Sequence, residues 1–400
     1  MGKKHWYALL LIVSITGGIA SCEKLMTKPP ADDSVLDGPV EGLTPEQLTQ
    51  FLKGDVAFND EVFTSATGLG PLFVATSCGT CHARDGKGHP FTTLTRFGQT
   101  DSTGNKFLHA GGPQLQDRAI YTYQPEQIPA GATFSKFTPP ANTGLGFLDN
   151  VTDASLMALA DPEDVNGDGV SGRPNWIKIP DYLSERTNSI VNNGKYIGRF
   201  GKKAAAYDLF HQTVNAYNQD MGIASSYEAH DTYNGQEIDP EVSNQTVIDV
   251  VAYLKTLKAP IQRTSSDPAV VSGQKIFTSI GCGKCHTPEL HTGYSSISAL
   301  SDKTFFPYSD LLLHDMGPKL DDGYTEGSAH TNEWRTPPLW GLGLSRNSQG
   351  SNYFLMHDGR ARSIEDAILL HGGEGQQSNN KFQQLSAPDK ATLIKFLESL

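Results

Sequence analysis

Cys78-Gly79-Thr80-Cys81-His82 and Cys282-Gly283-Lys284-Cys285-His286 are the two stretches around which the rest of this chain is organised. Each has the form Cys-x-x-Cys-His, the attachment signature of c-type haem. In that signature two thiols bond to the porphyrin edge, and the histidine that follows binds the iron. One such pentapeptide would also suit half of a zinc site, but two of them predict two covalently bound haems. The attachment residues are then Cys78, Cys81, Cys282 and Cys285, and the iron ligands are His82 and His286.

The bulk composition narrows the remaining possibilities. The chain has 400 residues, enough for two or three domains, and its fractions of hydrophobic and charged residues are those of a soluble globular protein. A formal net charge of −12 argues against a nucleic-acid partner and does not suggest binding to an anionic membrane surface. Four of the five cysteines lie in the two motifs, so none is left for an internal disulfide.

The fifth cysteine, Cys22, follows a pattern typical of export. The apolar run of residues 6–15 comes after a basic start and is too short to span a bilayer. Ile19-Ala20-Ser21-Cys22 resembles a bacterial lipobox, so we expect a signal peptide over 1–21 and a lipid on Cys22. Export implies anchoring on the periplasmic side, and because glutamate, not aspartate, follows the cysteine, we favour the outer membrane over the inner. The alternative is an ordinary signal peptide and a spare thiol.

Helix signals divide the mature chain into two haem-bearing parts. Residues 22–43 are polar and rich in proline, aspartate and glycine, which predicts a flexible tether. We expect a first haem domain over 44–260 and a second over 267–400, each opening with a capping residue followed by proline. Each also closes with an amphipathic helix, and the ends of these helices repeat one another as Tyr253-Leu254-x-x-Leu257 and Phe396-Leu397-x-x-Leu400.

These features predict a fold that is mainly α, with two cytochrome c-like domains and long loop-rich insertions. The longest insertion is residues 83–150, whose glycine, proline, threonine and glutamine content predicts loops that wrap a haem.

An acidic segment lies near the middle of the first domain. Asp164-x-Asn166-x-Asp168-Gly169 places oxygen side chains at alternate positions before a glycine, as in the first half of a calcium loop. Asn175 stands where such a loop usually has a bidentate glutamate. Calcium binding by Asp164, Asn166 and Asp168 and a solvated acidic turn therefore both remain open.

A histidine near the end of the second domain is a candidate for the sixth iron position. Ser363 and Asp366 predict a helix start, and the glycine pair 372–373 predicts its end. On that helix His371 shares one face with Ile364 and Ile368. A core histidine and an iron ligand both fit this placement.

Several longer motifs, spread over nearly the whole mature chain, carry a family resemblance. They are Gly144-Leu145-Gly146-Phe147-Leu148-Asp149, Asp161-Pro162-x-Asp164-x-Asn166-Gly167-Asp168-Gly169, Asp220-Met221-Gly222-Ile223, Leu313-His314-Asp315-Met316-Gly317, Glu333-Trp334-Arg335-Thr336-Pro337-Pro338-Leu339-Trp340 and His357-Asp358-Gly359-Arg360. With these motifs the chain resembles the di-haem oxidoreductase family, which is related to bacterial di-haem cytochrome c peroxidases and to the di-haem enzymes that mature tryptophan tryptophylquinone.

The resemblance implies a distal ligand for the second haem. In the peroxidases that ligand follows a His-Asp-Gly motif by 14 residues, and 14 residues after His357 is His371. The resemblance and the helix face thus select the same residue, and we predict that His286 and His371 bind the second iron. Met316 is the rival ligand.

The same comparison implies a different first site. When Leu209 is aligned with Ile364, the position that matches His371 is Ala216, which cannot bind iron, so we expect an open or exchangeable sixth position. Asp220 corresponds to the acid that assists peroxide cleavage in the peroxidases, if a two-residue gap is allowed. We therefore predict Asp220 as the distal acid and Gln212 as a residue of the same site, with a helix-end cap as the alternative role of Asp220.

One departure from the relatives concerns Lys202. Relatives commonly have a tryptophan between the haems at this position. If that tryptophan carries electrons in them, the route in this chain must differ.

These inferences lead to a peroxidase-type oxidoreductase. The second haem would receive electrons from a small redox protein or a quinol-linked donor, and the first would reduce peroxide or oxidise an unknown substrate. We expect contact with the membrane through the lipid anchor only. The alternative is a non-enzymatic periplasmic electron-transfer cytochrome with both irons six-coordinate.

Overall fold

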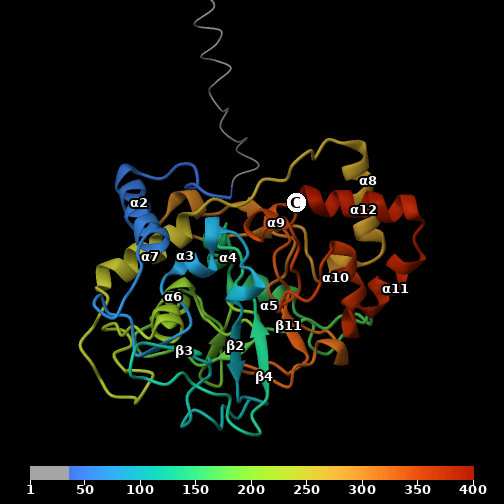
Figure 1. Cartoon of the computed structure of the whole chain (residues 1–400). Helices are drawn as coiled ribbons and strands as arrows, with labels where there is room; N and C mark the ends of the chain where they lie inside the picture. Colours follow the sequence, from blue (N-terminus) through green and yellow to red (C-terminus); the bar gives the residue numbers. More distant parts are fainter. Residues whose placement is uncertain (1–35) are drawn as a thin grey trace, which may run out of the picture. The chain divides into compact units, whose positions relative to one another are not determined.

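Two pairs of crossing helices, one from each half of the sequence, frame the structure, a computed structural model that describes residues 36–400. In the first pair α2 (Pro45–Asn59) packs against α7 (Asn244–Thr256), and in the second α8 (Pro268–Ser279) packs against α12 (Ala387–Ser399) (Figure 1). All four helices begin at the predicted caps, whose side chains accept a hydrogen bond from a backbone N–H of the first turn. The caps are Thr44, Ser243, Asp267 and Ser386.

Each crossing is centred on a glycine. A Cβ atom added at Gly54 of α2 would lie 2.0 Å from the carbonyl oxygen of Asp249 in α7. A Cβ atom at Gly273 of α8 would lie 2.4 Å from the carbonyl oxygen of Thr392 in α12. Only glycine allows backbones to approach so closely, so the two helix pairs use the same packing device.

The remaining helices are short. They are α3 (Cys78–Cys81), α4 (Leu145–Asp149), α5 (Asp153–Leu159), α6 (Leu209–Asn215), α9 (Ser345–Ser348), α10 (Ile364–Leu370) and α11 (Gln376–Gln384). The helix α6 continues into a π-helical turn, η4 (Ala216–Asp220). The 3-10 turns are η2 (Ala83–Asp85), η3 (Pro90–Thr92), η5 (Cys282–Lys284), η6 (Ser298–Leu300), η7 (Pro318–Leu320), η8 (Leu342–Leu344) and η9 (Gly373–Gly375).

Short antiparallel strands join the segments between the helices. The two-stranded pairs are β1 (Leu72–Phe73) with β3 (Arg118–Ala119), β2 (Leu94–Phe97) with β4 (Phe134–Phe137), β8 (Leu290–His291) with β9 (Thr304–Phe305), and β10 (Leu313–Asp315) with β11 (Glu333–Arg335). A three-stranded sheet has the order β5 (Trp176–Ile177), β7 (Lys195–Ile197), β6 (Val191–Asn192).

The prediction of a mainly α fold is wrong. The structure is 35% helical and 12% strand, with much of the chain in loops and no dominant helical bundle. The physical reason is that the chain between the capped helices is rich in glycine, proline and small polar residues. Such segments bury few apolar side chains in a periodic way, so they form turns and strands of two to four residues instead of helices.

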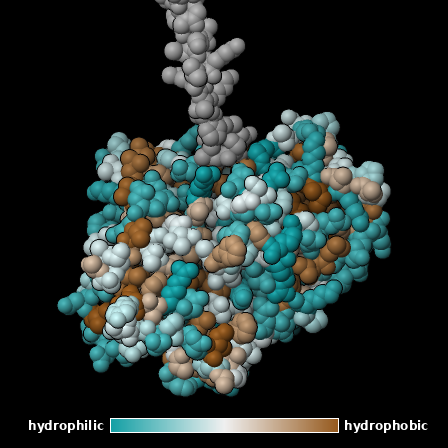
Figure 2. All heavy atoms as spheres, in the orientation of Figure 1, coloured by the Kyte–Doolittle hydropathy of each residue, from teal (hydrophilic) through white to brown (hydrophobic). Residues whose placement is uncertain are grey.

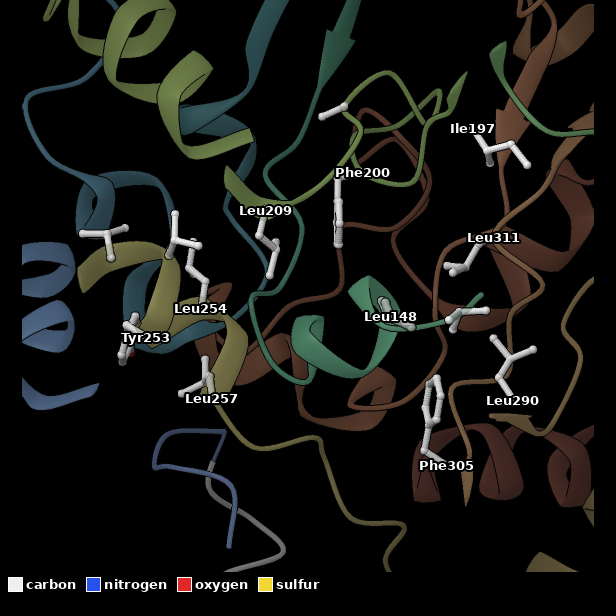
Figure 3. Packing of buried hydrophobic residues seen from close by; sticks show 14 of the residues in the cluster. Leu148, Ile197, Phe200, Leu209, Tyr253, Leu254, Leu257, Leu290, Phe305 and Leu311 are labelled. Carbon is white, nitrogen blue, oxygen red and sulfur yellow. The ribbon is translucent and has the colours of Figure 1, made fainter. Parts of the chain in front are cut away.

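The main hydrophobic core takes residues from both halves of the sequence. Figure 3 shows Tyr253 and Leu254 of α7 toward one end of this core and Leu290 and Phe305 of the second half toward the other. A second cluster consists of residues from α8, α10, α11 and α12 and the loops between them. On the face seen in Figure 2, hydrophobic residues lie in separate patches among hydrophilic ones.

Polar contacts also join the two halves. Arg173 exchanges backbone hydrogen bonds with Leu313 and forms an ion pair with Glu333. Residues 36–400 form one compact unit, and the predicted boundary between 260 and 267 stays a prediction.

The predicted signal peptide, Cys22 and most of the predicted tether lie outside the described residues. Within residues 36–400, we find no helix whose length and apolar content would let it cross a bilayer.

Candidate haem-binding sites

The first Cys-x-x-Cys-His motif forms the short helix α3. Ser77 caps it by accepting a hydrogen bond from the N–H of Thr80. His82 follows directly, and its Nδ1 lies 2.9 Å from the carbonyl oxygen of Pro140. Since a carbonyl only accepts, Nδ1 carries the proton and Nε2 is left free to bind a metal. Burial lowers the pKa of His82 to about 4, which keeps the imidazole in the neutral form that metals require.

The second motif repeats this arrangement. The Nδ1 of His286 lies 3.0 Å from the carbonyl oxygen of Tyr308, so Nε2 is again the free nitrogen. The Nδ1 of His371, which directly follows α10, lies 2.7 Å from the carbonyl oxygen of Ala367. Both rings therefore present an unprotonated nitrogen.

The two rings of this second site lie near each other, with their planes inclined at 50°. The ring centroids of His286 and His371 are 6.5 Å apart. Two metal–imidazole bonds of about 2.0 Å would place the ring centres roughly 6 Å apart, which is close to the observed separation. The rival residue, Met316, packs instead with Phe137, Leu320 and Trp334. The geometry thus favours His371 over Met316 as the partner of His286.

The four cysteines of the motifs fit thioether attachment. All four are free of disulfide bonds. Burial raises the pKa of Cys78, Cys81 and Cys282 to about 12. A zinc site would need the thiolate form, whereas a thioether sulfur is uncharged and suits these half-buried positions.

Asp220, the predicted distal acid, ends the π-helical turn η4 close to the first motif. Its carbonyl oxygen accepts hydrogen bonds from the N–H groups of Val74 (2.7 Å) and Ala75 (3.0 Å), which lead into that motif. After burial, the negative charge of Asp220 is the next cause of the raised pKa of both Cys78 and Cys81. Sequence reasoning therefore selected an acid that lies beside the first attachment site.

Two side chains that the sequence does not indicate, one neutral and one cationic, lie around the carboxylate of Asp220. The Nε2 of Gln114 donates a hydrogen bond to it, and Arg96 donates one to the Oε1 of Gln114 at 3.1 Å. Burial raises the pKa of Asp220 to about 6, while the bond from Gln114 and the charge of Arg96 lower it. Asp220 can therefore change its protonation state near neutral pH. Gln114 and Arg96 lie in the loop-rich stretch of residues 83–150, whose irregular pattern gives no sign of which side chains point inward.

Gln212, the other predicted residue of this site, lies on α6 and is half-buried. Among the described residues, no hydrogen bond joins its side chain to Asp220. Ala216 lies at the other end of η4 from Asp220, and no histidine ring is paired with that of His82 within residues 36–400. The ring partner of His82 is Phe58, at 6.0 Å.

A buried histidine beside the second motif was also missed. The Nε2 of His314 lies 2.8 Å from Asp310, and its Nδ1 lies 2.6 Å from Glu374. Burial lowers the pKa of His314, but Asp310 and Glu374 raise it well above its usual value, which favours the protonated ring. Cys285, His314 and Glu374 are close enough to hold a metal ion, but a thioether at Cys285 would occupy that sulfur. The charged ring therefore serves better as a fixed support of the second motif.

The acidic loop reaches the second motif as well. Lys284 donates a hydrogen bond to the carbonyl oxygen of Asp168 at 2.7 Å. Within the loop, Asp164 and Asn166 accept hydrogen bonds from the N–H of Asp168, so backbone groups of the loop already use some of the oxygens proposed for calcium. Calcium at this loop remains a prediction.

Comparisons with known proteins relate much of this chain to one family. A family model described as "Di-haem oxidoreductase, putative peroxidase" matches residues 136–400. A search of curated proteins found no match. Among solved structures, a chain of hydrazine synthase from Kuenenia stuttgartiensis, pressurised with 20 bar xenon, matches with 14% identity and a TM-score of 0.40 over 94% of this chain and 98% of that one. A similarity at this level carries no conclusion about fold or function.

Proposed function

Because the chain belongs to the di-haem oxidoreductase family, we propose that it is a peroxidase-type oxidoreductase with two covalently bound c-type haems and unequal iron sites. Cys78, Cys81 and His82 would hold the first haem. Cys282, Cys285 and the histidine pair His286 and His371 would hold the second.

The observation that carries this proposal is the asymmetry between the sites. In the second site the ring centroids of two imidazoles lie 6.5 Å apart, close to the separation that two bonds to one metal ion would give. In the first site the position aligned with His371 is Ala216, and a carboxylate with a pKa near 6, Asp220, lies beside the attachment motif. An iron held by two imidazoles suits electron transfer, whereas an iron with an open side can bind a small molecule.

Haem iron supplies the electron transfer and the coordination position that such a reaction needs. The protein's contribution is proton movement at the first site. The carboxylate of Asp220 would accept a proton from one oxygen of the peroxide and return it to the other, so that the departing group leaves as water. Two electrons and two further protons complete the reduction to two molecules of water. An unknown organic substrate could be oxidised at the same open site.

Gln114 and Arg96 would position the acid. The bond from Gln114 fixes the carboxylate, and Arg96 holds the amide of Gln114 in turn. Arg96 is itself fixed by Glu326 at 2.5 Å. This chain of contacts keeps Asp220 oriented without placing a cation directly on it.

The cellular setting belongs to the proposal too. We place the protein on the periplasmic side of the bacterial envelope, held by a lipid on Cys22, with electrons entering the second site from a small redox protein or a quinol-linked donor. Calcium would bind at Asp164, Asn166 and Asp168.

The spin state of the ferric protein tests the proposal. We expect electron paramagnetic resonance to show one low-spin haem and one that is high-spin, or becomes so on half-reduction, together with peroxide turnover. Two permanently low-spin haems without turnover would contradict an enzyme and leave an electron-transfer cytochrome.

A further inference from the structure

Three cationic side chains act on one another electrostatically, and one of them, Lys202, also acts on His82 of the first motif. They belong to Lys87, Lys202 and Arg335. Lys87 and Lys202 are half-buried, and within residues 36–400 neither ammonium group has a hydrogen bond or an ion pair. The acid nearest in electrostatic effect is Asp358, which instead pairs with Arg360 at 2.7 Å.

Arg335 is held in place by the loop that carries Lys202. Its Nε donates to the carbonyl oxygen of Gly201 at 2.9 Å, and its backbone N–H donates to the carbonyl oxygen of Lys202 at 3.0 Å. The Nη1 atom of the same guanidinium is buried and has no partner in the described chain. A fixed guanidinium with an unused buried donor is a ready site for a carboxylate.

These cations oppose one another electrostatically. Burial, and then repulsion from Lys87 and Arg335, lowers the pKa of Lys202 well below its usual value. Burial lowers the pKa of Lys87 to about 8. Removing cations from water without an ion-pair partner is unfavourable, and within residues 36–400 neither Lys87 nor Lys202 has such a partner.

The cluster lies within electrostatic reach of both haem sites. The charge of Lys202 contributes to the lowered pKa of His82. Arg335 belongs to β11 and feels the charge of Asp310, which binds His314 beside Cys285. An anion at this cluster would therefore be close to the cofactors.

We infer that Lys87, Lys202 and Arg335 bind the propionate carboxylates of the haems, with Lys202 serving the first haem. Propionates are the anionic groups that a haem brings into a protein, and they supply the missing counter-charge. Lys202 also stands where the resemblance places a tryptophan, so this chain would have an ion pair where its relatives have an aromatic ring. The inference rests on the haem attachment in the proposed function, not on peroxide chemistry.

Reduction potentials test this inference in the full-length holoprotein. The variants are Lys202→Gln and Lys87→Gln, with the exposed Lys178→Gln as a matched control. Loss of a nearby cation destabilises the added electron, so we expect a redox titration followed by visible absorption to show a more negative potential for the first haem in K202Q. K87Q should shift it in the same direction, and K178Q should leave it unchanged. A K202Q potential equal to that of K178Q would overturn the inference.

Thermal stability gives an independent second measurement. If propionates pair with Lys202, K202Q breaks an ion pair and its holoprotein unfolds at a lower temperature than the parent. If the cation is unpaired, K202Q removes an unfavourable buried charge, and a higher unfolding temperature would refute the inference.

The other source of a carboxylate is a ligand from solution. Titrating the parent protein with sodium acetate at constant ionic strength should leave the potential of the first haem unchanged, because the propionates already occupy the cations. An acetate-dependent shift that K202Q abolishes would show an exchangeable anion site and refute the inference. A haem-loaded protein without peroxide turnover would contradict the proposed function and leave this inference standing.

Discussion

The two haem-binding halves share a frame of two crossing helices, α2 with α7 and α8 with α12, and differ in the residues around it. In the first half Phe58 lies 5.5 Å from the ring of Tyr253 and 6.0 Å from that of His82. In the second half Phe277 lies 5.5 Å from Phe396 and 6.5 Å from His286. The same helix crossing thus supports both motifs, so a difference in function must come from the residues outside this frame.

Two such differences stand out. The second site has a facing imidazole, His371, where the first has Asp220 and Ala216 nearby. The closing helix of the first half carries Tyr253, whose hydroxyl donates to the buried Asp85 at 2.7 Å, whereas the second half has Phe396 at the equivalent place. At this equivalent place the first half therefore has a polar side chain and the second an apolar one, while the polar network of the second half lies at His314.

The largest expected effect comes from removing one attachment motif. We expect the double substitution Cys282→Ala and Cys285→Ala to reduce covalent haem from two per chain to one, because both thioether bonds to the second haem are lost. Mass spectrometry and the absorbance of the alkaline pyridine complex measure this. Cys22→Ala is the control and should keep two haems. Two haems in the double variant would contradict the attachment that we propose.

The next largest effect is expected from a substitution that makes the second site resemble the first. His371→Ala removes the facing imidazole, so we expect the low-spin ferric signal of the second haem to disappear in electron paramagnetic resonance. Met316→Leu tests the rival ligand and should preserve that signal. If M316L rather than H371A removes the signal, the ligand assignment is wrong.

A substitution in the first haem site tests the same difference between the two sites. We expect Asp220→Asn to reduce peroxide turnover by about 10²- to 10⁴-fold, the usual contribution of a general acid–base group, with both haem spectra retained. Asp239→Asn, at an exposed acid, is the control. Unchanged turnover in D220N would exclude Asp220 from the chemistry.

The pH dependence of peroxide turnover gives a second test of Asp220. Burial raises the pKa of Asp220 to about 6, and the carboxylate must be deprotonated to accept a proton. Parent turnover should therefore fall as the pH decreases through about 6, and the residual turnover of D220N should lack this decline.

The shared frame predicts equal effects in both halves. Gly54→Ala and Gly273→Ala each drive a Cβ into the backbone of the partner helix, so we expect each to destabilise the protein by about 3 kcal/mol. Gly283→Ala is the control, since its Cβ would meet no atom closer than 3.9 Å. Denaturant unfolding of the holoprotein measures the change. A small effect at only one crossing would show that the two frames are not equivalent.

The smallest expected effect concerns Tyr253. Tyr253→Phe removes the hydrogen bond to Asp85 and should lower the free energy of unfolding by about 1 kcal/mol near neutral pH. Burial raises the pKa of Asp85 to about 7, and the tyrosine lowers it. Because Asp85 binds a proton more tightly when folded, its contribution to stability falls as the pH rises toward 7.

The variant should lose most above pH 7, where Asp85 is charged, and little in acid, where it is neutral. Phe396→Tyr is the reverse substitution and should not stabilise the second half. An Y253F effect that does not vary with pH would contradict this assignment.

Local signals predicted the parts of the fold that they could specify. The capped starts of α2, α7, α8, α10 and α12 are confirmed because a capping side chain and its N–H partner lie within one turn. The strands were missed, since two to four residues are too few to show an alternating pattern. The mainly α prediction is wrong for the same reason, because the helices have clear local signals and the short strands and loops between them have none.

The residues of the candidate site likewise fall into those that local sequence predicts and those that it does not. His82, His286 and His371 follow local motifs, and the structure gives all three the same carbonyl-bound Nδ1. Gln114 reaches Asp220, and Arg96 reaches the adjacent Gln219, across more than 100 positions of sequence, and nothing local marks such contacts.

The π-helical turn at the end of α6 determines how the side chain of Asp220 is oriented. A π turn holds one residue more than an α turn, so it rotates everything that follows by about 100° around the helix axis. Deleting one residue between Ala216 and Asp220 would restore a regular spiral and swing the carboxylate away from Gln114, although the chemical composition of the site would hardly change. One extra residue in this turn therefore sets the direction in which the Asp220 carboxylate points, rather than its distance along the helix.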